Sequence, residues 1–135
     1  RALRTDPAPD ATAIGGASLG GVVSLYAATE HPDVFGMALV ESPTLLANGR
    51  RLARYFEDRS SWPGRVHLGA GGREAIRGQS GGDNPSYVEA VGRLQSLMES
   101  RGVEVSMVHA PEAEHNEPAW AERFDDALMF LFGAE

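Results

Sequence analysis

Apolar residues recur along the chain with two alternating spacings, and each spacing predicts one type of element. Short continuous apolar runs are typical of strands that are buried on both faces of a parallel sheet. Apolar residues three and four positions apart are typical of helices that pack one face against a core. Strands are predicted for residues 12–16, 36–42, 65–71 and 103–110. Helices are predicted for residues 18–31, 49–59, 86–101 and 119–132.

Signals at the ends of these segments support the assignment. A proline disfavours helix in the residue before it, so the first helix is predicted to end at His31. Asn84-Pro85 combines an N-cap residue with a proline in the first turn, and that helix stops at Gly102. Residues 69–83 are rich in glycine and serine and too long for a plain connection, which predicts a loop with a function. Residues 111–118, PEAEHNEP, predict a second, polar loop.

The alternation of strands and helices predicts the fold class. It is typical of an α/β protein in which helices cover both faces of a parallel sheet. No repeat or linker interrupts the pattern, so residues 1–135 are predicted to form a single domain. In such sheets the ligand-binding and catalytic residues lie on the loops that follow the carboxyl ends of the strands. Ser18 and the two predicted loops, residues 69–83 and 111–118, all fall at these ends.

One serine stands among closely spaced glycines at the end of the first predicted strand. Residues 16–20, Gly-Ala-Ser-Leu-Gly, fit the G-x-S-x-G pattern of a nucleophile elbow. A direct turn from strand to helix forces Ser18 to a positive φ. The turn is also expected to bring Gly16 and Gly20 too close together for a Cβ, and Gly21 permits close packing of the helix on the strand. Such a turn raises the serine hydroxyl above the edge of the sheet.

Two alternatives compete with this interpretation of the motif. A phosphate-binding loop is the first, but the glycines lack a following Lys-Ser/Thr pair and the G-x-G-x-x-G spacing. A glycine-rich turn with an incidental serine is the second. The strand before the motif and the helix after it favour the elbow. In an elbow the N–H of Leu19 lies at the start of the helix and points at the oxyanion that develops during attack on a carbonyl.

An elbow serine needs a general base, and the usual chain order of these sites is serine, acid, histidine. His31 lies at the end of a predicted helix, where a cation suits the dipole. His67 and His109 lie inside predicted strands and are more typical of packed or edge residues. His115 lies between the last strand and the last helix, so it is the predicted base, with His109 as the second choice.

A carboxylate is expected to orient that histidine. Glu74 follows the third predicted strand by a few residues, within reach of an imidazole Nδ1. Asp83 and Glu112 are its rivals, and a solvated surface glutamate is the plain alternative. The carboxylates and histidines of residues 109–115 could instead ligate a metal, but in a loop such residues are more often solvated charge. No metal and no cofactor are therefore predicted.

Composition narrows the classes of function. A chain of 135 residues with 42% hydrophobic content can bury the core of one domain. A net charge of −7 argues against nucleic acid or an anionic membrane as a partner. The absence of cysteine excludes disulfides and thiolate metal sites. No apolar run reaches the ~18 residues of a membrane span and no signal peptide is recognisable, so a cytoplasmic location is expected.

The stretch GGASLGGVVSLYAATEHPDVFGMALVESPTL, residues 15–45, resembles the putative-esterase branch of the α/β-hydrolases. That branch includes enterochelin esterases, formylglutathione hydrolase and mycolyltransferases. Residues 112–133 resemble the histidine segment of the family, which implies that His115 is the base and Trp120 the tryptophan of the following helix. Residues 65–75 resemble the strand and turn that carry the acid, which implies Glu74, although some members work with a serine–histidine pair alone.

The resemblance covers only the second half of the family's domain. It implies a partial α/β-hydrolase fold of about four strands, from the nucleophile strand onward. The chain opens without an initiator methionine shortly before the serine motif, so an upstream part is expected to be missing. The elbow strand is central in the family, so here it is expected to expose an unpaired edge. A complementing N-terminal segment or a second copy of the chain is the partner that such an edge implies.

Together these features predict a serine carboxylic-ester hydrolase that acts on a small-molecule ester through an acyl-enzyme. Ser18 is the expected nucleophile, His115 the base, Glu74 the acid and the Leu19 N–H one oxyanion donor. An acyltransferase that uses the same residues is one alternative. A non-catalytic hydrolase fragment that serves in binding or assembly is the other. The apolar residues of the 42–59 region are compatible with a substrate cleft or with ordinary core packing.

Overall fold

The computed structural model describes residues 5–46, 51–74 and 82–133. The predicted loop 69–83 therefore lies partly outside the described residues, as does the start of the helix predicted from residue 49.

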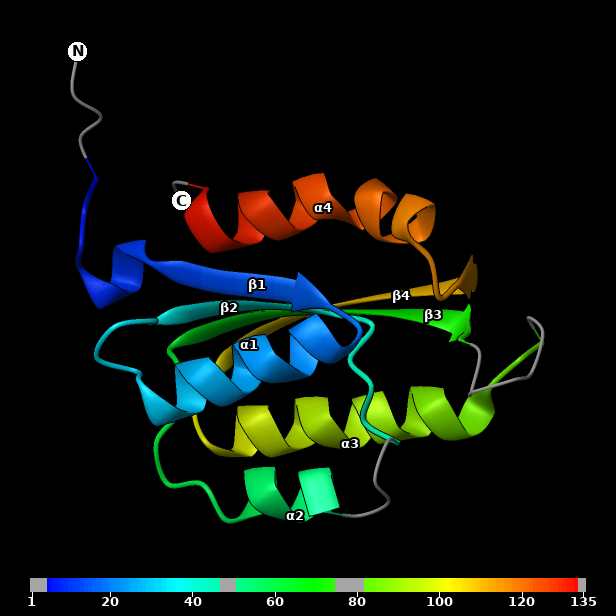
Figure 1. Cartoon of the computed structure of the whole chain (residues 1–135), viewed down its shortest axis with the longest axis horizontal. Coiled ribbons are helices and arrows are strands. Elements are labelled where there is room, and N and C mark those ends of the chain that lie inside the picture. Colours follow the sequence, from blue (N-terminus) through cyan, green and yellow to red (C-terminus); the bar gives the residue numbers. More distant parts are fainter. Residues whose placement is uncertain (1–4, 47–50, 75–81, 134–135) are drawn as a thin grey trace.

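In the described residues, four parallel strands form one sheet in the order of the sequence (Figure 1). They are β1 (Ala13–Ala17), β2 (Met37–Glu41), β3 (Arg65–Arg73) and β4 (Glu104–Glu114). Each strand pairs with the next, so that Ala17 lies opposite Glu41 and Glu41 lies opposite Gly69. The carboxyl ends of β1, β2 and β3 thus lie together at one edge of the sheet. The predicted parallel sheet is confirmed.

Helices cover both faces of this sheet (Figure 1). The helices α1 (Leu19–Glu30), α2 (Arg51–Glu57) and α3 (Pro85–Ser100) lie on one side, and α4 (Glu117–Phe132) lies on the other. A short 3-10 turn, η1 (Pro9–Ala11), precedes β1. The predicted layered α/β architecture is therefore correct for the part of the chain that the structure describes.

Asparagine side chains fix the starts of α3 and α4. The Oδ1 of Asn84 accepts the Tyr87 N–H at 3.1 Å, and the Oδ1 of Asn116 accepts the Ala119 N–H at 3.0 Å. Each satisfies a backbone donor that has no partner within the helix. Gly102 follows α3 with a φ of 81°, a conformation that glycine adopts without strain. The sequence signals at Asn84 and Gly102 therefore act as predicted.

Two strands extend further than the sequence pattern predicts. Residues up to Arg73 belong to β3, although residues 69–83 were predicted to form a loop. Residues up to Glu114 belong to β4, although residues 111–118 were predicted to form a loop. Glycine and proline are poor strand formers on average, but pairing between β3 and β4 continues past them through a register shift after Gly71. Only two residues remain to connect β4 to α4.

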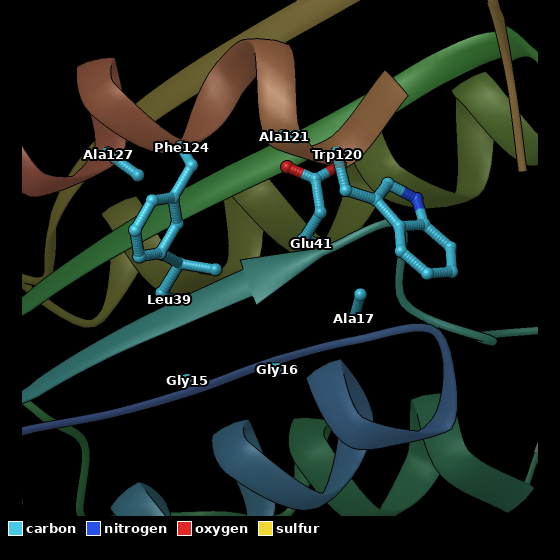
Figure 2. A pocket seen from close by; sticks show the side chains of 9 residues that line it. All are labelled: Gly15, Gly16, Ala17, Leu39, Glu41, Trp120, Ala121, Phe124 and Ala127. Atoms are coloured by element: carbon cyan, nitrogen blue, oxygen red, sulfur yellow. The ribbon is translucent and has the colours of Figure 1, made fainter. Parts of the chain in front are cut away.

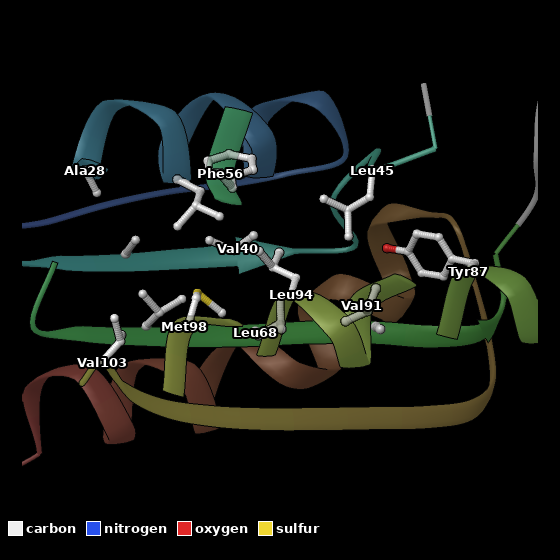
Figure 3. Packing of buried hydrophobic residues seen from close by; sticks show 14 residues of the cluster. Ala28, Val40, Leu45, Phe56, Leu68, Tyr87, Val91, Leu94, Met98 and Val103 are labelled. Carbon is white, nitrogen blue, oxygen red and sulfur yellow. The ribbon is translucent and has the colours of Figure 1, made fainter. Parts of the chain in front are cut away.

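The main hydrophobic core lies between the sheet and the helices α1, α2 and α3 (Figure 3). Val40 and Leu68 from the strands meet Leu25 of α1 and Met98 of α3, all of them fully buried. Phe56 of α2 is buried in the same cluster. Burial of these side chains fixes the helices against the sheet and thereby fixes the edge at which the strands end.

No helix in the described segments is both long and apolar enough to cross a membrane.

Candidate active site

Ser18 occupies a sharp turn between β1 and α1. Its φ is 59° and its ψ is −124°, a conformation that costs free energy for a residue with a Cβ. The Ser18 N–H donates to the Glu41 carbonyl at 2.9 Å, and the Ser18 carbonyl accepts the N–H of Val22 and of Thr44, both at 3.3 Å. These three backbone bonds hold Ser18 in place, and its positive φ is the conformation that the elbow motif predicted.

The glycines of the motif have different structural roles. A Cβ on Gly16 would lie 2.7 Å from the carbonyl carbon of Gly20, a distance that real Cβ atoms essentially never show. A Cβ on Gly21 would lie 2.9 Å from the Glu41 carbonyl oxygen, so Gly21 permits the close helix–strand packing that was predicted. A Cβ on Gly20 would meet nothing within 4 Å. The prediction of a steric requirement at Gly20 is therefore wrong, because the exposed start of α1 leaves that position open.

The structure brings His115 to Ser18 from the opposite end of the sequence. His115 lies in the two-residue connection between β4 and α4, and its Nε2 is 2.7 Å from the Ser18 Oγ. The N-cap bond of Asn116 fixes the start of α4 directly after it. The indole of Trp120, one turn into α4, stands edge-on to the imidazole with ring centroids 5.1 Å apart. The imidazole is therefore held by the helix start on one side and by an aromatic ring on another.

Glu74 contacts the other nitrogen of that imidazole. Its Oε2 lies in short hydrogen-bond contact with the His115 Nδ1. Its Oε1 accepts the Gly71 N–H at 2.8 Å and the Ser42 hydroxyl at 2.5 Å. With Glu74 ionised, the Nδ1–H donates to it and Nε2 is left to accept the Ser18 hydroxyl proton. The arrangement thus selects the tautomer that a general base requires.

The Glu74 carboxyl is almost completely buried, with 2% of its surface exposed. Burial by itself raises the pKa of Glu74. The hydrogen bonds from His115, Ser42 and the Gly71 N–H outweigh that effect and hold the pKa of this carboxyl below its ordinary value. The carboxylate is therefore ionised at neutral pH, in the form that accepts a proton donor from the imidazole.

The other predicted candidates lie away from this cluster. Asp83 and Glu112 are exposed and pair with Arg73. His109 is exposed on β4. His67 is buried in β3, where burial lowers its pKa, and neither of its ring nitrogens has a hydrogen-bond partner among the described residues. None of these four residues contacts Ser18 or His115 in the described parts of the chain.

Leu19, whose N–H was predicted as an oxyanion donor, begins α1 directly after Ser18. Leu19 is the first residue of α1, so no earlier turn of helix supplies an acceptor for its N–H. No acceptor for this N–H occurs among the residues that the structure describes.

Sequence reasoning missed four polar side chains around the site. Thr44 places its hydroxyl 3.1 Å from the Ser18 Oγ. Ser42, itself at a positive φ of 43°, bridges Glu74 and Glu41 through its hydroxyl. Arg123 of α4 pairs with Glu41 at 2.6 Å, and both side chains are buried. No spacing in the sequence indicates these contacts, because Glu41 and Arg123 are 82 positions apart.

A cleft of about 400 Å³ lies beside the site, between β1 and α4 (Figure 2). Trp120 and Phe124 line it from the helix, and Leu39 and Glu41 line it from β2. Gly15, Gly16 and Ala17 of β1 and the small side chains of Ala121 and Ala127 of α4 complete its wall. The cleft lies over the face of β1 and β2 next to α4, and β1 is the strand at this end of the sheet in the described residues. Within the same residues, no group of three or more side chains is arranged to hold a metal ion.

Comparison with solved structures reveals the same fold in several hydrolases. The enterobactin esterase FES from Shigella flexneri matches with a TM-score of 0.75 and 22% identity, over 94% of this chain and 33% of that one. A ferulic acid esterase matches with a TM-score of 0.69 and 14% identity, over 93% of this chain and 52% of that one. FphF, a fluorophosphonate-binding serine hydrolase of Staphylococcus aureus, matches with a TM-score of 0.66 and 12% identity, over 93% of this chain and 56% of that one.

These structures share the fold of this chain, which spans about a third of the first of them and about half of the other two. No curated protein sequence matches the chain significantly. A family model described as "Putative esterase" matches residues 2–131, which is nearly the whole sequence. The family resemblance of the serine and histidine segments is thus confirmed, and the chain belongs to this esterase family.

Proposed function

We propose that the protein is a serine carboxylic-ester hydrolase that works through an acyl-enzyme. The observation that carries the proposal is the continuous contact from the strained Ser18 hydroxyl, through both nitrogens of His115, to the buried Glu74 carboxylate. Membership in an esterase family supports ester hydrolysis in general. The names of the structural relatives, an enterobactin esterase and a ferulic acid esterase among them, agree with an ester as substrate class.

In the proposed first half-reaction, the Ser18 Oγ attacks the carbonyl carbon of the ester. Its proton moves to His115 Nε2, and the carbonyl electron pair becomes an oxyanion. The bond to the leaving alkoxide then breaks, and the alkoxide takes the proton from Nε2. The products are a free alcohol and an ester of the acyl group with Ser18.

In the proposed second half-reaction, water attacks the acyl-enzyme. His115 Nε2 accepts a proton from that water and returns it to the Ser18 Oγ as the carboxylic acid leaves. Glu74 stabilises the imidazolium of both half-reactions through Nδ1. An alcohol in place of water would give acyl transfer with the same residues, and product analysis with an added alcohol distinguishes the two outcomes.

The oxyanion needs more than one donor. The Leu19 N–H supplies one in this proposal, and a second is expected from the part of the esterase relatives that this chain does not span. Removal of one oxyanion-hole donor typically lowers kcat by about 10²–10³. We therefore expect slow turnover from this chain alone, even with the serine, histidine and glutamate aligned.

A second candidate function is that of one part of an assembled hydrolase. The observation that favours it is the β1 edge, which lacks a strand neighbour among the described residues and borders the open apolar cleft. A strand added along β1 would cover both features and would bring residues near Ser18. In this case the chain gains its activity on assembly with the complementing segment.

Covalent labelling with a fluorophosphonate probe tests the proposal. We expect the chain to be labelled, the Ser18→Ala variant to remain unlabelled, and His115→Ala to be labelled at least about 10³-fold more slowly. Ser96→Ala is the matched control, since Ser96 is exposed on α3, away from the site. Absence of labelling in a sample whose circular dichroism shows the folded state would contradict the catalytic proposal and support the assembly role.

A further inference from the structure

A second buried carboxylate lies behind the proposed acid. Glu41, the last residue of β2, is 4% exposed, and Arg123 of α4 is 5% exposed. The guanidinium donates to the Glu41 Oε1 through Nη2 at 2.6 Å and through Nε at 3.2 Å. A buried ion pair is often no more stabilising than apolar residues of the same size, so its presence here calls for a further reason.

The fold leaves room for this pair at a specific place. A Cβ on Gly69, the residue of β3 opposite Glu41, would lie 2.0 Å from the Glu41 Oε2. The Glu41 side chain therefore extends over the bare backbone of β3, toward the residues that hold Glu74. A glycine in the interior of a strand costs stability, which again points to a specific role.

The Ser42 hydroxyl connects the two carboxylates. Its Oγ is 3.0 Å from the Glu41 Oε1 and 2.5 Å from the Glu74 Oε1. A hydroxyl has one proton, so it can donate to only one of them. Arg123 already gives the Glu41 Oε1 two N–H donors, and its Nη2 lies 3.5 Å from the Ser42 Oγ, which can accept. The donors therefore run in one direction, from Arg123 through Ser42 to Glu74.

We propose that Arg123, Glu41 and Ser42 are positioning residues for the acid of the site. Arg123 donates hydrogen bonds to Glu41, so the Ser42 hydroxyl donates its proton to Glu74 instead. This hydrogen bond keeps the Glu74 carboxylate ionised and oriented toward His115. The inference rests on the proposed function, because Glu74 orients a catalytic base only if His115 acts as one. The hydrogen-bond chain itself can be tested without turnover.

Charge balance makes the proposal specific. In the folded protein the Glu41 carboxylate and the Arg123 guanidinium compensate each other. Without the guanidinium, an unpaired carboxylate would compete for the Ser42 proton and add negative charge beside Glu74. Without the Glu41 carboxylate, an unpaired positive charge would remain near Glu74. The two single substitutions must therefore act on Glu74 in opposite directions, which loss of packing alone would not produce.

Other titratable groups near the cluster are few and identifiable. His115 contacts Glu74 from the connection before α4. The phenol of Tyr87 in α3 interacts electrostatically with Glu74, Glu41 and Arg123. Burial raises the pKa of Tyr87 far above its ordinary value, so the phenol stays neutral throughout the useful pH range. His67 interacts electrostatically with Glu41 and Arg123, and also with Asp126. Residue-specific detection separates Glu74 from all of these groups.

The experiment is a carbon-13 NMR titration of the Glu74 carboxyl in the complete chain. We expect the pKa of Glu74 to rise in Ser42→Ala, which loses a hydrogen bond to the carboxylate, and in Arg123→Gln. We expect it to fall in Glu41→Gln and to return close to the parent value in the double variant Glu41→Gln/Arg123→Gln. Arg93→Gln is the matched control, because Arg93 forms an exposed ion pair with Glu89 on α3.

Two results would overturn the proposal: an unchanged pKa of Glu74 in Ser42→Ala, or shifts of the same sign in Arg123→Gln and Glu41→Gln. If Arg123→Gln does not fold, Glu41→Gln and Ser42→Ala still test the proposal, because they must shift the Glu74 pKa in opposite directions. Fluorophosphonate labelling separates this proposal from the proposed function. Normal labelling together with an unchanged Glu74 pKa in the variants would contradict the positioning role but not the proposed function. If the Glu74 pKa shifts as expected but the protein is not labelled, the catalytic proposal is contradicted and the hydrogen-bond chain from Arg123 to Glu74 is still supported.

Discussion

Gly16 and Gly20 are the same residue type, two positions either side of Ser18, yet the structure requires only one of them. The backbone of Gly20 blocks a side chain on Gly16, while a side chain on Gly20 points into open space. The motif alone makes the two positions look equivalent. The difference arises because β1 faces the helix start, whereas the start of α1 faces solvent in the described part of the chain.

The first prediction follows from this asymmetry. Gly16→Ala forces a Cβ against backbone atoms, and we expect it to lower the free energy of unfolding by about 1–3 kcal/mol. Gly20→Ala is expected to be neutral or to stabilise the protein by up to about 1 kcal/mol, because alanine favours helix over glycine. Chemical denaturation of both variants measures the difference. Equal losses in the two variants would contradict the geometry of the elbow.

His67 gives a prediction of pH dependence at the same scale. Burial lowers its pKa below the ordinary 6.5, an effect that the nearby Glu41 partly opposes. The unfolded chain therefore takes up a proton at a higher pH than the folded chain. The stability linked to His67 is fully present above about pH 6.5 and is lost as the pH falls below that value.

Thermal unfolding between about pH 7.5 and 5.5 measures this effect. We expect His67→Leu to reduce the fall in melting temperature toward acidic pH, because leucine fills the site without a proton to gain. His31→Gln is the control, since His31 is exposed at the end of α1. A His67→Leu protein with the same pH dependence as the parent would show that the acid sensitivity has another source.

Residue-level chemistry was predictable where it follows local rules. The positive φ of Ser18 and the place of His115 before a helix both follow from short stretches of sequence. The contacts of Ser42, Thr44 and Arg123 do not, because they depend on which strand lies beside which. The glycines of β3 were interpreted as a loop signal, but Gly69 makes room for the Glu41 carboxylate, and Gly71 makes room mainly for the Ala113 carbonyl of β4.

At the scale of elements, the connection between β4 and α4 determines how His115, the proposed base, is oriented. It contains only two residues, and the side chain of the second, Asn116, accepts the Ala119 N–H. The first is His115, so the imidazole is fixed by a strand end on one side and a capped helix on the other. The sequence predicted a longer loop here, since the pairing of β4 with β3 past Pro111 depends on a partner that is distant in the sequence.

The third prediction concerns this cap. Asn116→Ala removes the side-chain acceptor at the start of α4, and we expect a loss of about 1 kcal/mol in the free energy of unfolding. Slower fluorophosphonate labelling should accompany it, because His115 loses its fixed neighbour. Asn116→Ser keeps a capping oxygen and should retain most of both properties. Unchanged labelling in a destabilised Asn116→Ala protein would show that the cap supports the fold but does not orient the base.

At the scale of the whole molecule, two structural features coincide at β1. It leads into Ser18, the proposed nucleophile, and it is the strand at the end of the sheet whose residues line the apolar cleft. Exposed backbone donors and acceptors next to apolar side chains favour association with a further strand. The parallel sheet was predictable from the alternation of strands and helices, and the exposed edge of β1 was implied by the family resemblance, but the order of the strands was not predicted.

The fourth prediction tests this edge by sedimentation velocity. We expect the chain to self-associate with rising concentration. Phe124→Arg should reduce that association, since Phe124 lines the cleft from α4 and is about half exposed. Met129→Arg is the matched control, because Met129 lies on the same helix, is 70% exposed and does not line the cleft. A parent chain that stays monomeric at all concentrations, or equal effects of the two arginine variants, would argue against association through the cleft.

The Ser18–His115 contact joins residues that are 97 positions apart, and the histidine arrives only with the final strand–helix connection. During synthesis on the ribosome the hydroxyl therefore emerges long before its proton acceptor. Under the proposed mechanism, a nascent chain that has folded only through β3 would carry the nucleophile without its base. The proposed chemistry would then begin only after α4 docks on the sheet.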